Sequence, residues 1–128
     1  GSSIKNGTYS QFSPIVYPTE FTSRGGTIDI DHAPVQIITI DANCTITISN
    51  WGANNTYSSI KLIIKGNASS VVITNSTTAV FHIATGFAGN LTGGTASVSY
   101  PLSGKTEVLD LWSTDSGENI YIKSSGQY

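Results

Sequence analysis

Apolar and polar residues alternate in short runs along most of this 128-residue chain. The clearest runs are residues 27–31, 45–49 and 119–123, in which isoleucine occupies every second position. A period of two places successive side chains on opposite faces of a β-strand, whereas an amphipathic helix needs a period of about 3.6. No stretch of the sequence sustains the helical period, so the alternation predicts an all-β fold.

Turn signals separate these runs at fairly even intervals. About nine short strands follow one another roughly every ten residues, which is typical of a sandwich or a barrel. The breaks carry residues suited to turns, among them Asp41-Ala42-Asn43, Gly66-Asn67 and Asp115-Ser116-Gly117-Glu118. Pro101 is expected to end the strand that begins at Thr95, because proline cannot donate to a ladder. We therefore predict an antiparallel β-sandwich with a jelly-roll-like arrangement of strands.

The chain divides into two parts. Residues 1–24 show no clear period and contain Ser13-Pro14 and Tyr17-Pro18, so we predict an extended N-terminal arm or linker that docks on the domain or on a neighbour. Gly1-Ser2 is expected to be the remnant of a cleaved expression tag. Residues 25–128 carry the alternation and form the predicted β-sandwich domain, whose length fits a single domain.

The composition excludes several classes of function. Charged residues make up 11% of the chain, against about 25% in average soluble domains, and 34 of the 128 residues are serine or threonine. The formal net charge is −2 with no basic stripe, so we expect no binding to nucleic acid. No apolar run reaches the roughly 20 residues that span a bilayer, so we expect no membrane insertion.

Catalytic and metal-binding groups are sparse. Cys44, His32 and His82 are the only thiol and imidazole groups, too few for a zinc site, and neither histidine adjoins a nucleophile turn. We interpret His82 as a polar-face residue of a strand. We interpret the acidic groups at 29–41 and 110–118 as a solvated strand face and turn residues, with a bound calcium ion at Asp29 and Asp31 or near Asp115 as the alternative. We therefore predict no catalytic residue, no metal and no cofactor.

The aromatic residues are the best candidates for a binding surface. Exposed tryptophan and tyrosine side chains stack on sugar rings and anchor protein contacts. Our candidate binding residues lie in or beside loops or at the end of a strand: Trp51, Tyr57, Phe87 and Tyr100. The structural interpretation remains open beside this one: Trp51 plugs the end of the sandwich, and Trp112, in the middle of a strand, belongs to the core.

Five segments resemble a known group of proteins: residues 27–31, 35–40, 43–51, 59–66 and 108–117. Their strand and turn patterns, such as Asn43-Cys44-Thr45-Ile46-Thr47-Ile48-Ser49-Asn50-Trp51, resemble those near the ends of many tailed-phage fibre and virion structural proteins. The resemblance covers residues 27–123. It implies a small β-sandwich at the tip or along the shaft of a fibre, or on a capsid. It also implies a homotrimer and contacts with glycans or proteins of the host surface.

Three functions follow as alternatives. We expect a non-enzymatic bacteriophage structural module on the virion: a tail-fibre, receptor-binding or capsid-decorating domain that mediates assembly and surface contact. Its partners would be copies of itself, with a trimer favoured, other virion proteins, and a host-surface glycan or protein. The first alternative is a carbohydrate-binding module of a secreted or cell-surface protein, with Trp51, Tyr57 or Tyr100 as stacking residues. The second is a small glycoside hydrolase, which requires two carboxyl groups facing each other in a cleft.

Overall fold

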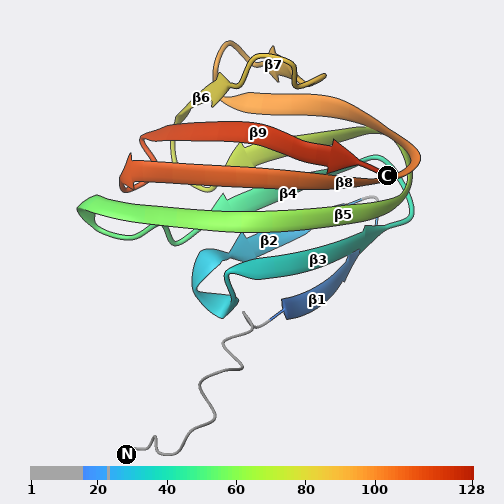
Figure 1. The fold of residues 1–128 in the computed structure, drawn as a ribbon, viewed down its shortest axis with the longest axis horizontal. Coiled ribbons are helices and arrows are strands. Elements are labelled where there is room, and N and C mark those ends of the chain that lie inside the picture. The colour runs from blue at the N-terminus through green and yellow to red at the C-terminus, as the bar shows by residue number, and fades with distance from the viewer. Residues whose placement is uncertain (1–15, 23) are drawn as a thin grey trace, which may run out of the picture.

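The computed structural model describes residues 16–22 and 24–128, and these residues form an all-β fold, as predicted (Figure 1). The strands, in chain order, are β1 (Val16–Phe21), β2 (Gly26–Asp29), β3 (Val35–Ile40), β4 (Cys44–Ser49), β5 (Asn54–Asn75), β6 (Val80–Ile83), β7 (Asn90–Thr92), β8 (Ser97–Asp115) and β9 (Asn119–Gln127). A short 3-10 helix, η2 (Ile30–His32), lies between β2 and β3. In the described ranges, no helix has the length and apolar character needed to cross a bilayer.

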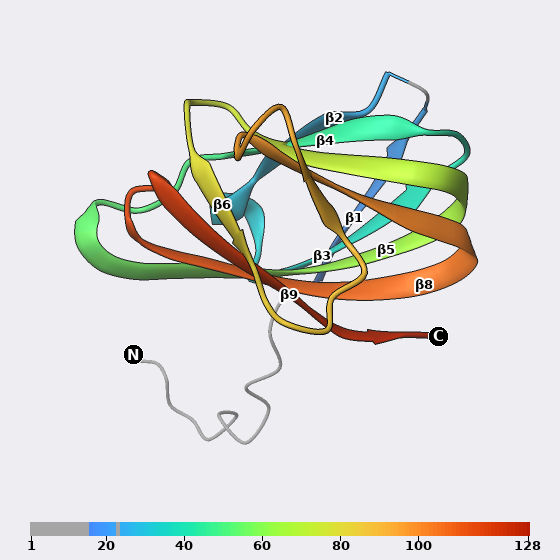
Figure 2. The same cartoon turned by 90° about the horizontal axis from the view of Figure 1, so that it is seen from above.

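All the strands belong to one mixed sheet that bends over on itself. One path through the sheet runs β1-β3-β5-β8-β9-β6, while β2 pairs with β4, β4 also pairs with β5, and β7 pairs with β8. The two longest strands, β5 and β8, curve from one side of the molecule to the other (Figure 2). We call the side formed by β1, β3, β9, β6 and the adjoining parts of β5 and β8 the front half, and the opposite side the back half.

The prediction of antiparallel, jelly-roll-like pairing is wrong. Five of the eight strand pairings are parallel, including β1 with β3, β2 with β4, and both β3 and β4 with β5. The reason is that successive strands alternate between the two halves, so β1 pairs with β3, β2 with β4 and β3 with β5, each with the strand two places further along the chain. The three antiparallel pairs all involve β8, which pairs with β5, β7 and β9.

Two predicted breaks within strands are also wrong. The chain does not reverse at Gly66, whose φ of +138° and the neighbouring register shifts bend β5 without ending it. Nor does Pro101 end a strand, because β8 continues through it. Its neighbours Tyr100 and Leu102 pair with Val71 and Ala68, so Pro101 lies opposite an irregularity in β5 where its missing N–H leaves the ladder intact.

The core lies between the two halves and is formed by the inward residues of the alternating runs. These side chains are fully buried: Ile28, Ile38, Ile46, Ile48, Leu62, Ile64, Ile73, Phe81, Leu102, Leu109, Leu111 and Ile120. Burying one such aliphatic or aromatic side chain stabilises a fold by about 1.5–3 kcal/mol. The alternation seen in the sequence therefore corresponds to a real division between core and surface.

The sheet begins earlier than the predicted domain boundary. Strand β1 falls within residues 1–24, the predicted arm, and pairs in parallel with β3 from Val16 to Phe21. The described sheet therefore includes Val16–Phe21, which lie within the predicted arm. The remainder of the predicted arm, residues 1–15 with the expected tag remnant, lies outside the described residues.

The turn between β8 and β9 has the geometry that its sequence predicts. Ser116 and Gly117 both have positive φ, at 59° and 81°, which is what a type I′ hairpin turn requires. The Asp115 carboxylate accepts hydrogen bonds from the backbone N–H of Asn119 at 2.9 Å, from its Nδ2 at 2.8 Å and from Ser113 Oγ at 2.9 Å. The carboxylate thus holds the two ends of the turn together.

The Asp115 contacts predict a pH-dependent effect on stability. Hydrogen bonds from Asn119 hold the pKa of Asp115 below its usual value. The stabilisation is therefore present above the unfolded-state pKa of about 3.9 and is lost as pH falls through the lower folded-state pKa. We expect Asp115→Asn to be less stable than the unchanged protein at pH 7 and the gap to shrink below about pH 4. Urea unfolding at pH 7 and pH 3 measures the difference in stability between the two proteins. If this difference is the same at both pH values, the assignment is contradicted.

Candidate functional site

Four rings from four strands stack in a row on the outer surface of the front half. Tyr57 of β5 and Trp112 of β8 have ring centroids 6.0 Å apart, and Trp112 and Tyr121 of β9 have centroids 4.1 Å apart with planes only 13° apart. His82 of β6 follows Tyr121 at 4.7 Å and 17°. We call these four residues the aromatic row.

The register of the sheet produces the aromatic row. Tyr121 is the direct cross-strand partner of both Trp112 and His82. Neighbouring strands lie about 4.8 Å apart, which is within the range of centroid separations of stacked rings. The rings therefore stand face to face, so the inner faces cover one another. The ring edges stay open, as does the outer face of Tyr57, which is 68% exposed at one end of the row. His82, at the other end, is also exposed.

A groove of about 560 Å³ runs beside the Tyr57 end of the row. Its walls and floor include Tyr57, Ser59, Lys61, Asp110, Trp112, Lys123 and Ser125, together with Pro34 and Val35 at the start of β3. Aromatic, hydroxyl and charged groups thus meet in one depression. A site of this kind offers both an apolar contact area and directed hydrogen bonds to a small molecule.

The charged groups of the groove centre on Asp110. Lys61 Nζ lies 2.9 Å from Asp110 Oδ1, and Ser125 Oγ donates a hydrogen bond to Oδ2. Burial by itself raises the pKa of Asp110, but the contacts with Ser125 and Lys61 outweigh it and the pKa is lowered. Lys123 sits directly opposite Asp110 on β9 and adds a second positive charge. The groove therefore holds two ammonium groups for one carboxylate, in a protein whose formal net charge is −2.

The predicted binding residues do not come together. Tyr57 lies in the groove, but Trp51 is buried, donates from Nε1 to Asn75 Oδ1 at 2.9 Å, and packs against Gly117. Tyr100 is also buried, and Phe87 packs against it with centroids 5.8 Å apart. Trp51 therefore has the buried position of the structural interpretation, and only Tyr57 of the four candidates presents an open ring face.

The prediction that Trp112 belongs to the core is wrong. Leu109 and Leu111 already occupy the inner face of β8, so the period of two places Trp112 on the outer face. That phase was readable in the sequence and is the signal for this site residue. His82 is an exposed polar-face residue, as predicted, with Nε2 2.9 Å from Asn119 Oδ1.

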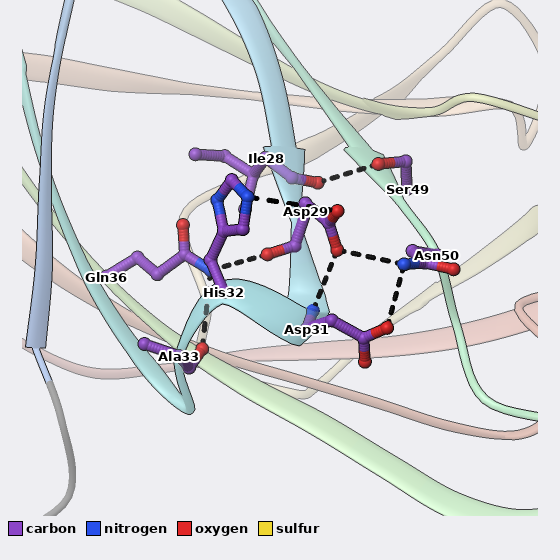
Figure 3. Close-up of polar contacts among 8 residues, drawn as sticks. All are labelled: Ile28, Asp29, Asp31, His32, Ala33, Gln36, Ser49 and Asn50. Carbon is purple, nitrogen blue, oxygen red and sulfur yellow. Dashed lines mark hydrogen bonds and ion pairs between the residues drawn. The ribbon is translucent and has the colours of Figure 1, made fainter.

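The acidic pair at the end of β2 has a structural role. Asp29 Oδ1 accepts from the backbone N–H of Asp31 at 2.8 Å and so begins η2. Asn50 Nδ2 lies between the two carboxylates, 3.1 Å from Asp29 Oδ1 and 2.9 Å from Asp31 Oδ2 (Figure 3). The contact with Asn50 is the main reason that the pKa of Asp29 is lowered. The Asn50 amide thus makes the contacts with these carboxylate oxygens that a bound cation would otherwise make.

The turn after η2 is held from the core side by Gln36. Its Nε2 donates to the backbone oxygen of Asp29 at 2.7 Å and to that of Ala33 at 3.3 Å. Figure 3 shows these contacts beside the Asn50 bridge. Within residues 16–22 and 24–128, no cluster of three or more acidic, histidine or cysteine side chains could hold a metal ion.

Comparison of the chain with protein-family models, curated proteins and solved structures finds no match.

Proposed function

We propose that this protein is a non-enzymatic structural module of a bacteriophage particle, a tail-fibre, receptor-binding or capsid-decorating domain that contacts other surfaces through the front half. The virion assignment rests on the resemblance of residues 27–123 to phage structural modules. The contact role rests on the aromatic row, because exposed tryptophan and tyrosine side chains are the usual anchors of molecular interfaces. Its location would be the outer surface of the particle.

The chemistry of the groove supports a non-enzymatic role. Asp110 is the one carboxylate among the groove-lining residues described above, and it is held ionised by Lys61 and Ser125. A general acid needs a raised pKa, and a glycosidase needs a second carboxyl group across the cleft. The arrangement fits recognition of a bound group rather than bond cleavage.

Open strand edges support assembly with further copies. In the described part of the chain, β1 pairs with β3 alone and β2 with β4 alone, so both strands keep one edge uncovered. Unpaired backbone groups on such an edge are a template for pairing with another chain. Pro18 and Glu20 interrupt the β1 edge, whereas β2 carries no charge before Asp29. We therefore propose that the β2 edge of each copy contacts a different edge of the next copy, a head-to-tail contact that can close into a ring of three.

The mass in solution tests this assembly. We expect light scattering coupled to size exclusion to give three times the 13.5 kDa of the single chain. Thr27→Lys places a charge on the β2 edge and should reduce the mass to that of a monomer. Thr45→Lys is the matched control, since Thr45 is also exposed but lies on the inner strand β4. A monomeric unchanged protein, or a trimer that survives Thr27→Lys, contradicts assembly through this edge.

The runner-up function is a carbohydrate-binding module of a secreted or cell-surface protein. One observation favours it, the open face of Tyr57 beside hydroxyl and charged groups. The stacking within the row argues against a broad platform for a polysaccharide chain, because the inner ring faces already cover one another. Sugar recognition at this surface would therefore involve a single unit at the end of the row.

A further inference from the structure

We infer that the groove beside Tyr57 binds one pyranose unit that carries a carboxylate, such as a uronate or a sialate. This inference rests on the proposed contact role of the front half and names the chemistry of the surface that it contacts. It is carried by the open ring face of Tyr57, the excess of positive charge around Asp110 and the position of both in one depression.

The aromatic wall fits the apolar face of a sugar ring. Tyr57 ends the aromatic row, so Trp112 supports one face of its ring while the other face stays open. The C–H groups on one side of a pyranose pack well against such a face, and the supporting stack limits the motion of the ring. The volume of about 560 Å³ is sufficient for one or two sugar units.

The polar groups fit an acidic rather than a neutral sugar. The Asp110 carboxylate is already engaged by Lys61 Nζ at 2.9 Å and by the Ser125 hydroxyl. Lys123 is exposed on the same surface and directly opposite Asp110, which leaves ammonium protons for a second carboxylate. Charge-assisted hydrogen bonds of this kind are stronger than those between neutral groups. Ser59 and Ser125 supply hydroxyl partners for the remaining sugar oxygens.

Binding can be measured with defined sugars and three variants. The probes are oligosaccharides ending in glucuronate, galacturonate or sialate, each paired with its neutral counterpart, on an array and then in calorimetric titrations. We expect the acidic member of at least one pair to bind, and its affinity to fall as salt is raised. Tyr57→Ala removes the open face and Lys123→Gln the unpaired charge, and each should weaken binding about tenfold.

His82→Ala serves as the matched control. It removes the ring at the opposite end of the same row, outside the groove, and should change the affinity by less than about twofold. Tyr57 and Lys123 are both exposed, so these variants should keep the thermal unfolding midpoint of the unchanged protein. Binding of none of the acidic probes, equal binding of the neutral counterparts, or full affinity in Tyr57→Ala overturns the inference.

The outcome separates this inference from the assembly proposal. A trimer that binds no acidic sugar removes the ligand assignment and leaves the structural module in place. A monomer that binds an acidic sugar through Tyr57 and Lys123 supports the ligand and removes assembly along β2. The two proposals therefore fail on different measurements.

Discussion

Replacing Ile64 with alanine is expected to lower the free energy of unfolding by about 2–5 kcal/mol, the range typical of large-to-small changes in a packed core. Ile64 is fully buried on the inner face of β5, between Ile38 of β3 and Glu107 of β8. The substitution removes apolar contacts and leaves a cavity that a sheet hydrogen-bonded on both sides cannot easily close. Urea unfolding followed by circular dichroism gives the difference directly.

The neighbouring residue supplies the control for this prediction. Ile63 precedes Ile64 in the same strand but lies on the outer face of the front half and is only half-buried. We expect Ile63→Ala to cost less than about 1 kcal/mol, because it opens no cavity. Equal costs at the two positions would mean that β5 does not divide core from surface in the way described.

Gly66→Ala should lower the free energy of unfolding about as much as Ile64→Ala, by a different mechanism. Gly66 has a φ of +138°, and a β-carbon there would lie 1.9 Å from the backbone oxygen of Ile40. The neighbouring strand cannot move away without breaking the parallel pairing of β3 with β5. Combining backbone strain with this clash, we expect a loss of about 3 kcal/mol or more in unfolding free energy.

Gly104 separates the two contributions. It also has a positive φ, +69°, but a β-carbon there would meet no atom within 4 Å. Gly104→Ala should therefore show the conformational cost alone, about 1–2 kcal/mol. Thermal and urea unfolding compare Gly66→Ala with Gly104→Ala. Equal losses of stability would mean that the close approach of β3 to β5 is not the reason for the glycine at position 66.

The faces of the strands could be predicted from the sequence, but their partners could not. Alternation in residues 60–64 correctly separates the inner Ile60, Leu62 and Ile64 from the outer Ile63, because the period of a strand is local. The parallel pairing of the strands depends on residues far apart in the sequence. Val16 pairs with Val35, 19 residues on, and Val35 pairs with Lys61, 26 residues on, so no fixed interval marks the successive strands.

The candidate site was predictable only in part, for the same reason. Tyr57 was predicted from its position beside a polar loop, and the structure places it in the groove. The size of Trp112 favours the core, but Leu109 and Leu111 occupy the inner face of the strand, so the alternation assigns Trp112 to the outer face. Its neighbours Tyr121 and His82 join it through strand register, which depends on the pairing of β8, β9 and β6. A site built by register is found only once the pairing is known.

The position of β5 between β3 and β4 on one side and β8 on the other has a consequence for the order of folding. One edge of β5 pairs with β3 and β4, which are synthesised before it. The other edge pairs with β8, residues 97–115, which is synthesised later. During synthesis, a strand of 22 residues therefore keeps one row of backbone groups without its final partner. Long-range pairing is the slow step of β-protein folding, and exposed edges invite aggregation while it lasts. The nascent chain is thus most vulnerable in the interval between completing β5 and completing β8.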